Sequence, residues 1–122
     1  RDGDYANTLD IKKGGTAGIV QMGRLFALAS GSSVVDTRQR LREAAGDAVS
    51  RQGAQELLDA FDFLRALSFQ HQARQLREGV QPDYHIDPKS LGRLERERLR
   101  DAFRAIKSMQ NALATKYPVR NI

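Results

Sequence analysis

Apolar residues recur at three- and four-residue intervals in four segments of the chain. This period places apolar side chains on one face of an α-helix. The pattern predicts helices over residues 19–31, 37–46, 51–79 and 93–117, the last of them ending before Pro118.

The ends of the predicted helices coincide with residues that cap or stop helices. Asp36 or Thr37, and Ser50, are side chains that accept hydrogen bonds from the free amides of a first helical turn. Gly31 and Gly79 follow helical segments, where a left-handed residue commonly ends a helix. These signals support the boundaries that the apolar period indicates.

Each of the three longer helices has a stripe of residues expected to face the core. The first presents Ile19, Met22, Phe26 and Ala29. The third presents Leu57, Phe61, Leu64 and Ser68, flanked by Leu58, Leu67 and Leu76. The last presents Leu99, Phe103, Ile106, Leu113 and Tyr117. Helices of this kind bury their apolar faces against one another, which predicts a bundle.

The beginning of the chain has no helical pattern. TLDIK, residues 8–12, is expected to be a short extended segment, and KKGGTAG, residues 12–18, a loop, because adjacent glycines disfavour regular structure. The predicted fold class is therefore all-α: a helical bundle of about four helices with an irregular Gly-rich N-terminal segment. Residues 1–122 are expected to form a single domain, interpreted as a fragment of a longer protein because the chain starts without Met.

Charge and composition limit the classes of partner that the chain is expected to bind. The net charge is +5, and residues 89–122 contain nine basic and three acidic side chains, so the positive excess lies on this last segment. No nucleic-acid recognition motif accompanies it, and no apolar run is long enough to span a bilayer. We therefore expect no nucleic-acid partner and no membrane partner. The absence of Cys suits a cytoplasmic protein.

The third helix changes character at its end, where polar residues continue the apolar stripe. His71, Arg74 and Gln75 are spaced i, i+3 and i+4, so they share one face. One interpretation is a ligand-binding end, with Arg74 facing a carboxylate or phosphate. The alternative is that the bundle opens here and these groups bond to the following HIDPKS loop.

A second candidate site is LDIKKGG. Lys12 and Lys13 offer positive charge, and Gly14 and Gly15 allow backbone amides to approach a phosphate. The segment is not a Walker A loop. The alternative is a tight turn that leads into a helix.

Three further residues are weaker candidates. Asp87 and Lys89 lie close to His85 in YHIDPKS, and an Asp and a Lys together can perform acid–base chemistry. The alternative is that Asp87 is a turn residue before proline and that Lys89 pairs with it. Arg24 interrupts an apolar helix face. It is interpreted as an ion-pair partner of Asp59 or Asp62, or as a residue that points at a pocket.

Catalytic signatures are missing from the chain. It has no nucleophile elbow, no HExxH and no Gly-rich dinucleotide loop. A single His without a second ligand one turn away is also a poor metal site. We expect no catalytic residue and no metal site in this fragment.

Several segments resemble one family in order. Four segments carry the resemblance: LDIKKGGTAGIVQMGRLFAL, RQRLREAAG, SRQGAQELLDAFDFLRALSFQHQARQLREG and HIDPKSLGRLERERLRDAFRAIKSMQ. They are similar to the DUF294 C-terminal domain, a substrate-binding domain that follows DUF294-type nucleotidyltransferase domains. The resemblance covers about Leu9 to Tyr117. It implies a bacterial parent in which a catalytic domain, using Mg²⁺ and a nucleoside triphosphate, precedes this one. The Gly-Ser and Asp-x-Asp signature of that domain is absent here.

The resemblance also implies a function. The domain would bind substrate and position an acceptor, such as a protein, beside the catalytic domain, as in the related PII uridylyltransferase and glutamine synthetase adenylyltransferase group. The alternative is a regulatory protein-interaction or homodimerisation module of a signalling protein that carries CBS or cyclic-nucleotide-binding domains. An exposed apolar surface would favour that alternative.

Overall fold

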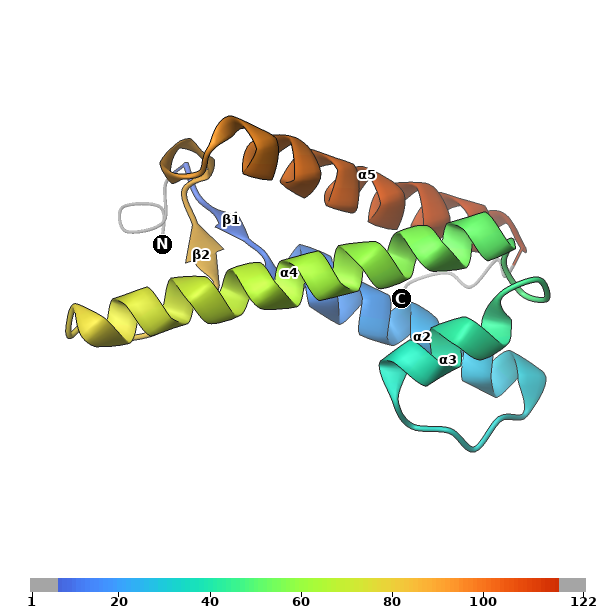
Figure 1. Ribbon diagram of the computed structural model, residues 1–122. Helices are drawn as coiled ribbons and strands as arrows, with labels where there is room; N and C mark the ends of the chain where they lie inside the picture. Colours follow the sequence, from blue (N-terminus) through green and yellow to red (C-terminus); the bar gives the residue numbers. More distant parts are fainter. Residues whose placement is uncertain (1–6, 117–122) are drawn as a thin grey trace.

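The computed structural model describes residues 7–116, most of which lie in four α-helices (Figure 1). The helices are α2 (Ala17–Ser30), α3 (Thr37–Ala44), α4 (Arg51–Arg77) and α5 (Arg93–Lys116). The predicted all-α bundle is confirmed. Within residues 7–116 no helix is both long and apolar enough to cross a lipid bilayer.

One small sheet accompanies the helices. Strand β1 (Leu9–Asp10) pairs antiparallel with β2 (His85–Ile86), so the predicted extended segment before the first helix is confirmed over two residues. Short helical turns follow both strands: η1 (Lys12–Thr16) after β1 and η2 (Pro88–Ser90) after β2. The sheet joins segments that are far apart in the sequence.

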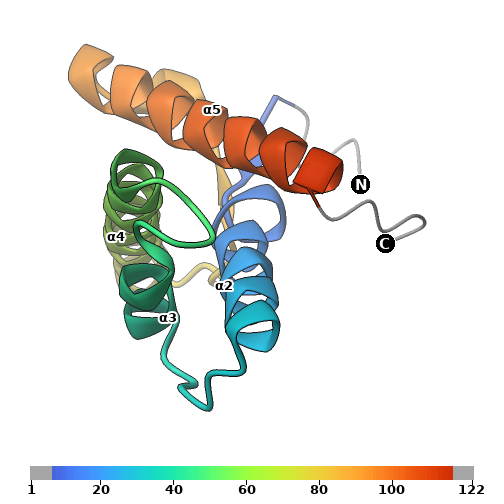
Figure 2. The same ribbon diagram turned by 90° about the vertical axis from the view of Figure 1, so that its right-hand side faces the viewer.

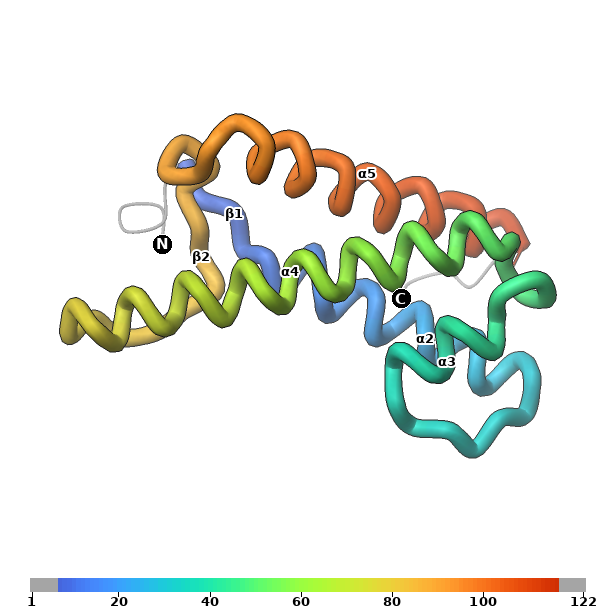
Figure 3. The backbone as a smooth tube through the Cα atoms, viewed as in Figure 1, coloured from blue at the N-terminus to red at the C-terminus, as the bar shows by residue number. Residues whose placement is uncertain are grey.

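The helices form layers around one core. Figure 2 shows α5 crossing above α4 and α2, with α3 on the opposite side below α4. The tube in Figure 3 shows the C-terminal part of α4 extending beyond the other helices before the chain turns back to β2. The α4 C-terminus is therefore covered less than the rest of the bundle.

The predicted core stripes are largely confirmed. Leu57 and Leu64 are fully enclosed, and Phe61 is 6% exposed. The expectation for Ala29 was wrong: it is exposed, and Ala27 is buried in its place. The buried stripe of α2 thus runs through the residue next to Phe26. Tyr117 lies outside the described residues.

The predicted caps are confirmed in detail. Asp36, not Thr37, caps α3 by accepting a hydrogen bond from the Gln39 amide at 2.9 Å. The hydroxyl of Ser50 accepts from the Gly53 amide at 2.9 Å at the start of α4. Gly31 and Gly79 adopt φ of 73° after α2 and α4. Local hydrogen bonding therefore sets these boundaries.

The prediction of a loop for KKGG was wrong. Residues 12–16 form η1, a π-helical turn that continues directly into α2, which starts at Ala17 rather than Ile19. Asp10 starts the turn, because its carboxylate accepts from the amides of Lys12 and Lys13 at 3.0 and 2.9 Å. Asp10 therefore acts as a side-chain cap for this segment.

Packing explains why glycine occupies this turn. A Cβ at Gly15 would lie 3.0 Å from Leu64 Cδ1 and 3.5 Å from Phe103 Cζ. The backbone of η1 thus approaches side chains of both α4 and α5 closely. Tertiary contacts outweigh the unfavourable helical propensity of the two glycines.

We expect Gly15→Ala to lower the free energy of unfolding by about 1–3 kcal/mol, because the added methyl group overpacks the contact with Leu64. Gly14→Ala is the matched control: its Cβ would be 3.6 Å from Phe103, an ordinary contact. That variant should be neutral or up to about 1 kcal/mol more stable. Urea unfolding measures both, and equal effects at the two positions would contradict the packing argument.

Candidate functional site

The polar end of α4 bonds to one residue of the following loop, Asp83. Its Oδ1 lies 3.1 Å from His71 Nε2 and accepts from Gln75 Nε2 at 3.2 Å. The same oxygen accepts from the backbone amide of His85 at 3.0 Å. One carboxylate thus connects the C-terminal part of α4 to the beginning of β2.

The backbone of Asp83 is held by the same helix. Its amide donates to Gln75 Oε1 at 2.9 Å, and its carbonyl accepts from Gln72 Nε2 at 3.0 Å. Bonds made by side chain and backbone together fix the loop on α4. This geometry matches the alternative in which the polar groups bond to the loop, although the contact is Asp83, just before HIDPKS.

The hydrogen bonds shift the titration of Asp83. Partial burial raises its pKa, but the bonds from the His85 amide, His71 and Gln75, together with the charge of His71, outweigh that effect. The pKa of Asp83 therefore lies below its ordinary value. The carboxylate form is the one that the network stabilises.

The small sheet brings the two main candidate segments to the same end of the bundle. Asp10 of β1 is opposite His85 of β2, and their Oδ2 and Nε2 atoms are 3.9 Å apart. The amide of Ile11 donates to the carbonyl of Tyr84 at 3.0 Å. Lys12 and Lys13 follow directly, so the KKGG segment lies beside the loop that His71 and Gln75 hold.

The ammonium groups of Lys12 and Lys13, rather than the amides of these two residues, are available to a ligand. The amides of Lys12 and Lys13 are already bonded to Asp10. The Lys12 Nζ lies 5.1 Å from the centre of the Tyr84 ring, and the Lys13 side chain is exposed. An anion at this position would meet two positive charges next to an aromatic ring.

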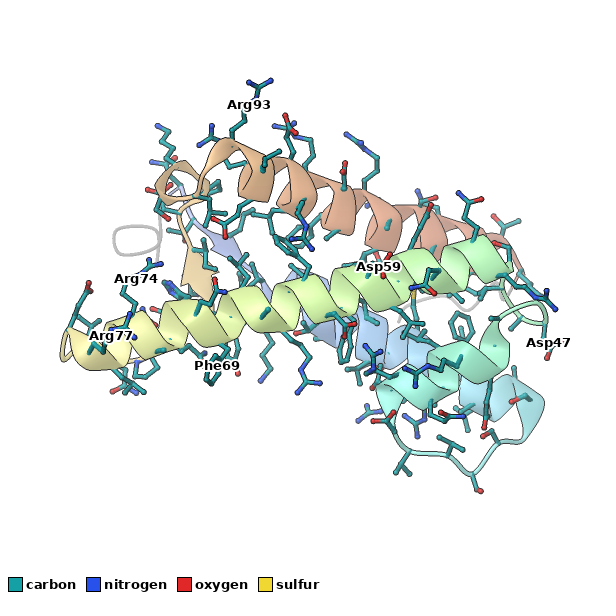
Figure 4. The ribbon with its side chains drawn as sticks, viewed as in Figure 1. Asp47, Asp59, Phe69, Arg74, Arg77 and Arg93 are labelled. Carbon is teal, nitrogen blue, oxygen red and sulfur yellow. The ribbon has the colours of Figure 1, made fainter. Side chains whose placement is uncertain are left out.

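Arg74 lies apart from the Asp83 network. Together with His71 it lines a hollow of about 50 Å³ that also contacts Ile86, Ser90 and Glu95. This volume suits one or two water molecules, whereas small-molecule sites usually measure several hundred cubic ångströms. Figure 4 shows Arg74 on the side of α4 that faces the β2 segment.

The interpretation of Arg24 as a partner of Asp59 or Asp62 was wrong. Arg24 is exposed on α2, and the ion pair of Asp62 is made by Arg38 of α3. Arg24 lines neither this hollow nor the larger groove between α4 and α5. The structure does not bring it to the end of the bundle that holds Lys12 and His71.

Asp87 and Lys89 form a local turn. The Asp87 side chain accepts from the Lys89 amide at 2.9 Å and caps η2, while the Asp87 carbonyl accepts from the Ser90 hydroxyl at 2.7 Å. Both side chains are exposed. The bonds of Asp87 are those of a turn residue before proline.

Comparison with protein families identifies the family of this chain. A family model described as "Putative nucleotidyltransferase substrate binding domain" matches residues 1–117. The chain belongs to this family. The resemblance seen in the sequence is confirmed at this level. Comparison with curated proteins and with solved structures finds no match.

Sequence reasoning missed the residue at the centre of the substrate-binding domain's polar network. Asp83 stands in QPDYH, between a proline and a tyrosine, and resembles an ordinary loop residue. The sequence indicated Asp83 only indirectly. The polar side chains at the end of α4 needed a hydrogen-bond acceptor, and Asp83 is the first carboxylate after Gly79 in the chain. Asp10 was missed because only the strand pairing makes it a neighbour of His85.

A larger hollow lies elsewhere, in a groove of about 840 Å³ between α4 and α5. Its α4 side carries Asp59 and Phe63, and its α5 side carries Arg98, whose guanidinium lies 4.4 Å from the Phe63 ring centre. None of the candidate site residues lines this groove. Across residues 7–116, no group of three or more His, Asp or Glu side chains is arranged to hold a metal ion.

Proposed function

We propose that this substrate-binding domain positions the acceptor of a nucleotidyltransferase whose catalytic domain lies outside this chain. Family membership supports the general role. The observation that carries the proposal is the β1–β2 pairing, which places Lys12 and Lys13 beside the network around Asp83. A positive, partly aromatic surface is thereby held on a fixed loop at one end of the bundle.

The proposed mechanism is positioning by charge. Lys12 and Lys13 attract the phosphate groups of the bound nucleotide, and Tyr84 supplies an apolar surface next to them. His71 and Gln75 act through Asp83 by holding the loop that carries Tyr84. Ordered partners of this kind lower the entropic cost of bringing two reactants together. Bond making and the binding of Mg²⁺ belong to the catalytic domain.

The finer part of the proposal concerns the parent protein. We infer a bacterial, cytoplasmic enzyme similar to the PII uridylyltransferase and glutamine synthetase adenylyltransferase group, with a protein as acceptor. Similarity of LDIKKGG to the Lys and Gly-Gly element of that group supports this inference. In this arrangement the domain forms one wall of the cleft between nucleotide and acceptor.

An amide NMR titration of the chain with ATP, UTP and CTP in the presence of Mg²⁺, at two salt concentrations, tests the proposal. We expect saturable shifts at residues 12–15 and 71–75 that persist at the higher salt concentration. In the Lys12→Ala/Lys13→Ala double variant the dissociation constant should rise about tenfold, equivalent to about 1.4 kcal/mol. Lys107→Ala, an exposed lysine on α5, is the matched control and should bind as the wild type does.

Two results would count against this proposal. Shifts that spread along α5 and vanish at high salt would indicate non-specific anion binding by the basic helix. An absence of shifts would mean that this domain alone contains no nucleotide site.

A further inference from the structure

The groove between α4 and α5 is elongated. On α4 its lining extends from Glu56 to Gln70, and on α5 it extends from Glu95 to Ser108. Because each helical residue advances about 1.5 Å, either stretch is about 20 Å long. The two helices that border the groove run in opposite directions (Figure 1). The groove therefore matches about four turns of a further helix in length.

The floor of the groove is apolar and consists largely of small side chains. Ala60 and Ala102 are buried, whereas Ala66 and Ala105 retain exposed surface. The ring of Phe63 also lines the groove and is half-buried. Small side chains at a helix contact let two helices approach closely. The floor thus suits the apolar face of an added helix, for which Phe63 provides the largest contact.

The sides of the groove are acidic. Five acidic side chains and two arginines line it, so carboxylates are in excess by three, although the chain as a whole has a net charge of +5. The acidic residues are Glu56, Asp59 and Asp62 on α4, and Glu95 and Asp101 on α5. Carboxylates on both helices attract a cationic partner to the groove and repel phosphate groups.

Three of these carboxylates are available to a partner. Glu56, Asp59 and Glu95 form no ion pair within residues 7–116, whereas the other two acids of the groove are paired with arginines. Glu56 and Asp59 accept hydrogen bonds from the side-chain amides of Gln52 and Gln55 at 3.2 and 2.9 Å. Figure 4 shows Asp59 on the side of α4 that faces α5. Since a neutral amide carries no charge, these hydrogen bonds leave the negative charges uncompensated.

The guanidinium of Arg98 covers the ring of Phe63 instead of pairing with a carboxylate. It lies 4.4 Å from the centre of the ring. Glu95 is one turn earlier on α5, yet the two side chains form no ion pair in the described part of the chain. A stacked arginine shields aromatic surface that would otherwise be open to solvent. Arg98 is therefore the side chain that an apolar group must displace to reach Phe63.

We propose that the α4–α5 groove binds a basic amphipathic α-helix of a partner protein. The apolar face of that helix contacts Phe63 and the alanine floor, which is the usual way in which an amphipathic helix occupies a groove. Its lysines or arginines pair with Glu56 and Asp59 on one side and with Glu95 on the other. The inference goes beyond the proposed substrate positioning, because it uses neither the KKGG segment nor the Asp83 network.

The exposed apolar side chains near the C-terminus of α4 lie outside this groove. Phe69 and Leu76 are both largely exposed, so the expectation that Leu76 flanks the buried stripe was wrong. Neither residue lines the groove, and Figure 4 shows Phe69 on the side of α4 that faces away from α5. The proposed contact surface is therefore confined to the groove.

Isothermal titration calorimetry of the 122-residue chain with a synthetic peptide is the first test. The peptide is a helix of about 14 residues, the length of the groove, with a stripe of leucine and alanine flanked by lysines. We expect saturable binding, with amide NMR shifts confined to the residues that line the groove. The same peptide with glutamates in place of the lysines should bind at least about tenfold more weakly. Absence of binding at millimolar peptide, or equal binding of the two peptides, would overturn the proposal.

Variants of the groove test its charges and its apolar floor separately. Asp59→Asn and Glu95→Gln should each raise the dissociation constant of the lysine peptide about three- to fivefold. Arg98→Ala should lower it about threefold, because the change uncovers Phe63 and removes a positive charge. Asp47→Asn is the matched control, since Asp47 is exposed before α4 and does not line the groove, and it should bind as the wild type does. Equal weakening by Asp47→Asn and Asp59→Asn would mean that only the net charge of the chain matters, and would contradict a site in the groove.

Competition with spermine distinguishes a helix site from a general cation site. Spermine carries positive charges on a flexible chain that has no apolar helical face. It should therefore leave the lysine peptide bound when the two are present at equal concentration. Displacement of the peptide under these conditions would show that the carboxylates bind polycations of any shape, which would overturn the proposal of a helical partner.

Discussion

Replacement of Phe61 by alanine is expected to lower the free energy of unfolding by about 3–5 kcal/mol. The ring is 6% exposed on the buried face of α4, where it belongs to the single core formed by all four helices. Its removal loses the transfer free energy of the ring and leaves a cavity that fixed helices refill only in part. Urea unfolding monitored by circular dichroism measures the loss as a lower midpoint with an unchanged slope.

Phe69→Ala provides the control for that experiment. It makes the same change two turns later on the same helix, at a ring that is 75% exposed. A substitution at the surface should cost less than about 1 kcal/mol. Equal losses at the two positions would mean that the assigned register of α4 is incorrect.

The second large effect is expected at Asp83. Asp83→Ala should destabilise the domain by about 2 kcal/mol at neutral pH, because His71, Gln75 and the His85 amide lose their common acceptor. The effect should be concentrated in the loop before β2, where faster amide hydrogen exchange would report it. Asp101→Ala is the matched control: its ion pair with Arg104 is exposed and should contribute less than about 1 kcal/mol.

The loss at Asp83 should depend on pH in a defined direction. Because the pKa of Asp83 is lowered in the folded state, its carboxylate stabilises the domain above the ordinary value of 3.8. This contribution is lost as the pH falls through the lowered pKa. The wild type and Asp83→Ala should therefore differ most above pH 4 and converge in more acidic solution. A difference that grows on acidification would contradict the network.

Substitution of His71 distinguishes a structural role of this side chain from a role in substrate binding. If His71 serves only to hold Asp83, His71→Ala should lower stability while turnover of the parent enzyme stays normal once the protein is folded. If it also shapes the acceptor site, turnover should fall more than stability does. The loss of turnover compared with the loss of stability therefore shows whether the polar end of α4 binds substrate or only holds the loop.

Much of the fold followed from local sequence. The period of apolar residues predicted the four helices, and Asp36, Ser50, Gly31 and Gly79 predicted their ends. The apolar period and the capping residues both act within a few positions along the chain, so they can be recognised from the sequence alone. The polar continuation at His71 and Gln75 was also recognised, together with the possibility that these groups bond to the next loop.

Other features could not be predicted from the sequence because they depend on contacts with residues that are distant along the chain. Two adjacent glycines disfavour a helix, yet residues 12–16 are helical because Leu64 and Phe103 pack against their backbone. One of the two interpretations of Arg24 paired it with Asp59 or Asp62, but the ion pair of Asp62 is made by Arg38. In both cases the outcome depends on how separate helices cross, which no local pattern encodes.

By itself, the sequence determined the helices, their caps and the family of this chain, because these depend on periodicity and on side chains near in sequence. Only the tertiary structure decided that Asp83 is the acceptor for the polar end of α4, and that β1 and β2 bring Lys12 and Lys13 beside it. The paired strand residues are 75 and 77 positions apart, and Asp83 is 8 to 12 positions from the α4 side chains that bond to it. The geometry of both sets of contacts exists only after the chain folds back on α4. The same packing decided which apolar face of α4 remains exposed.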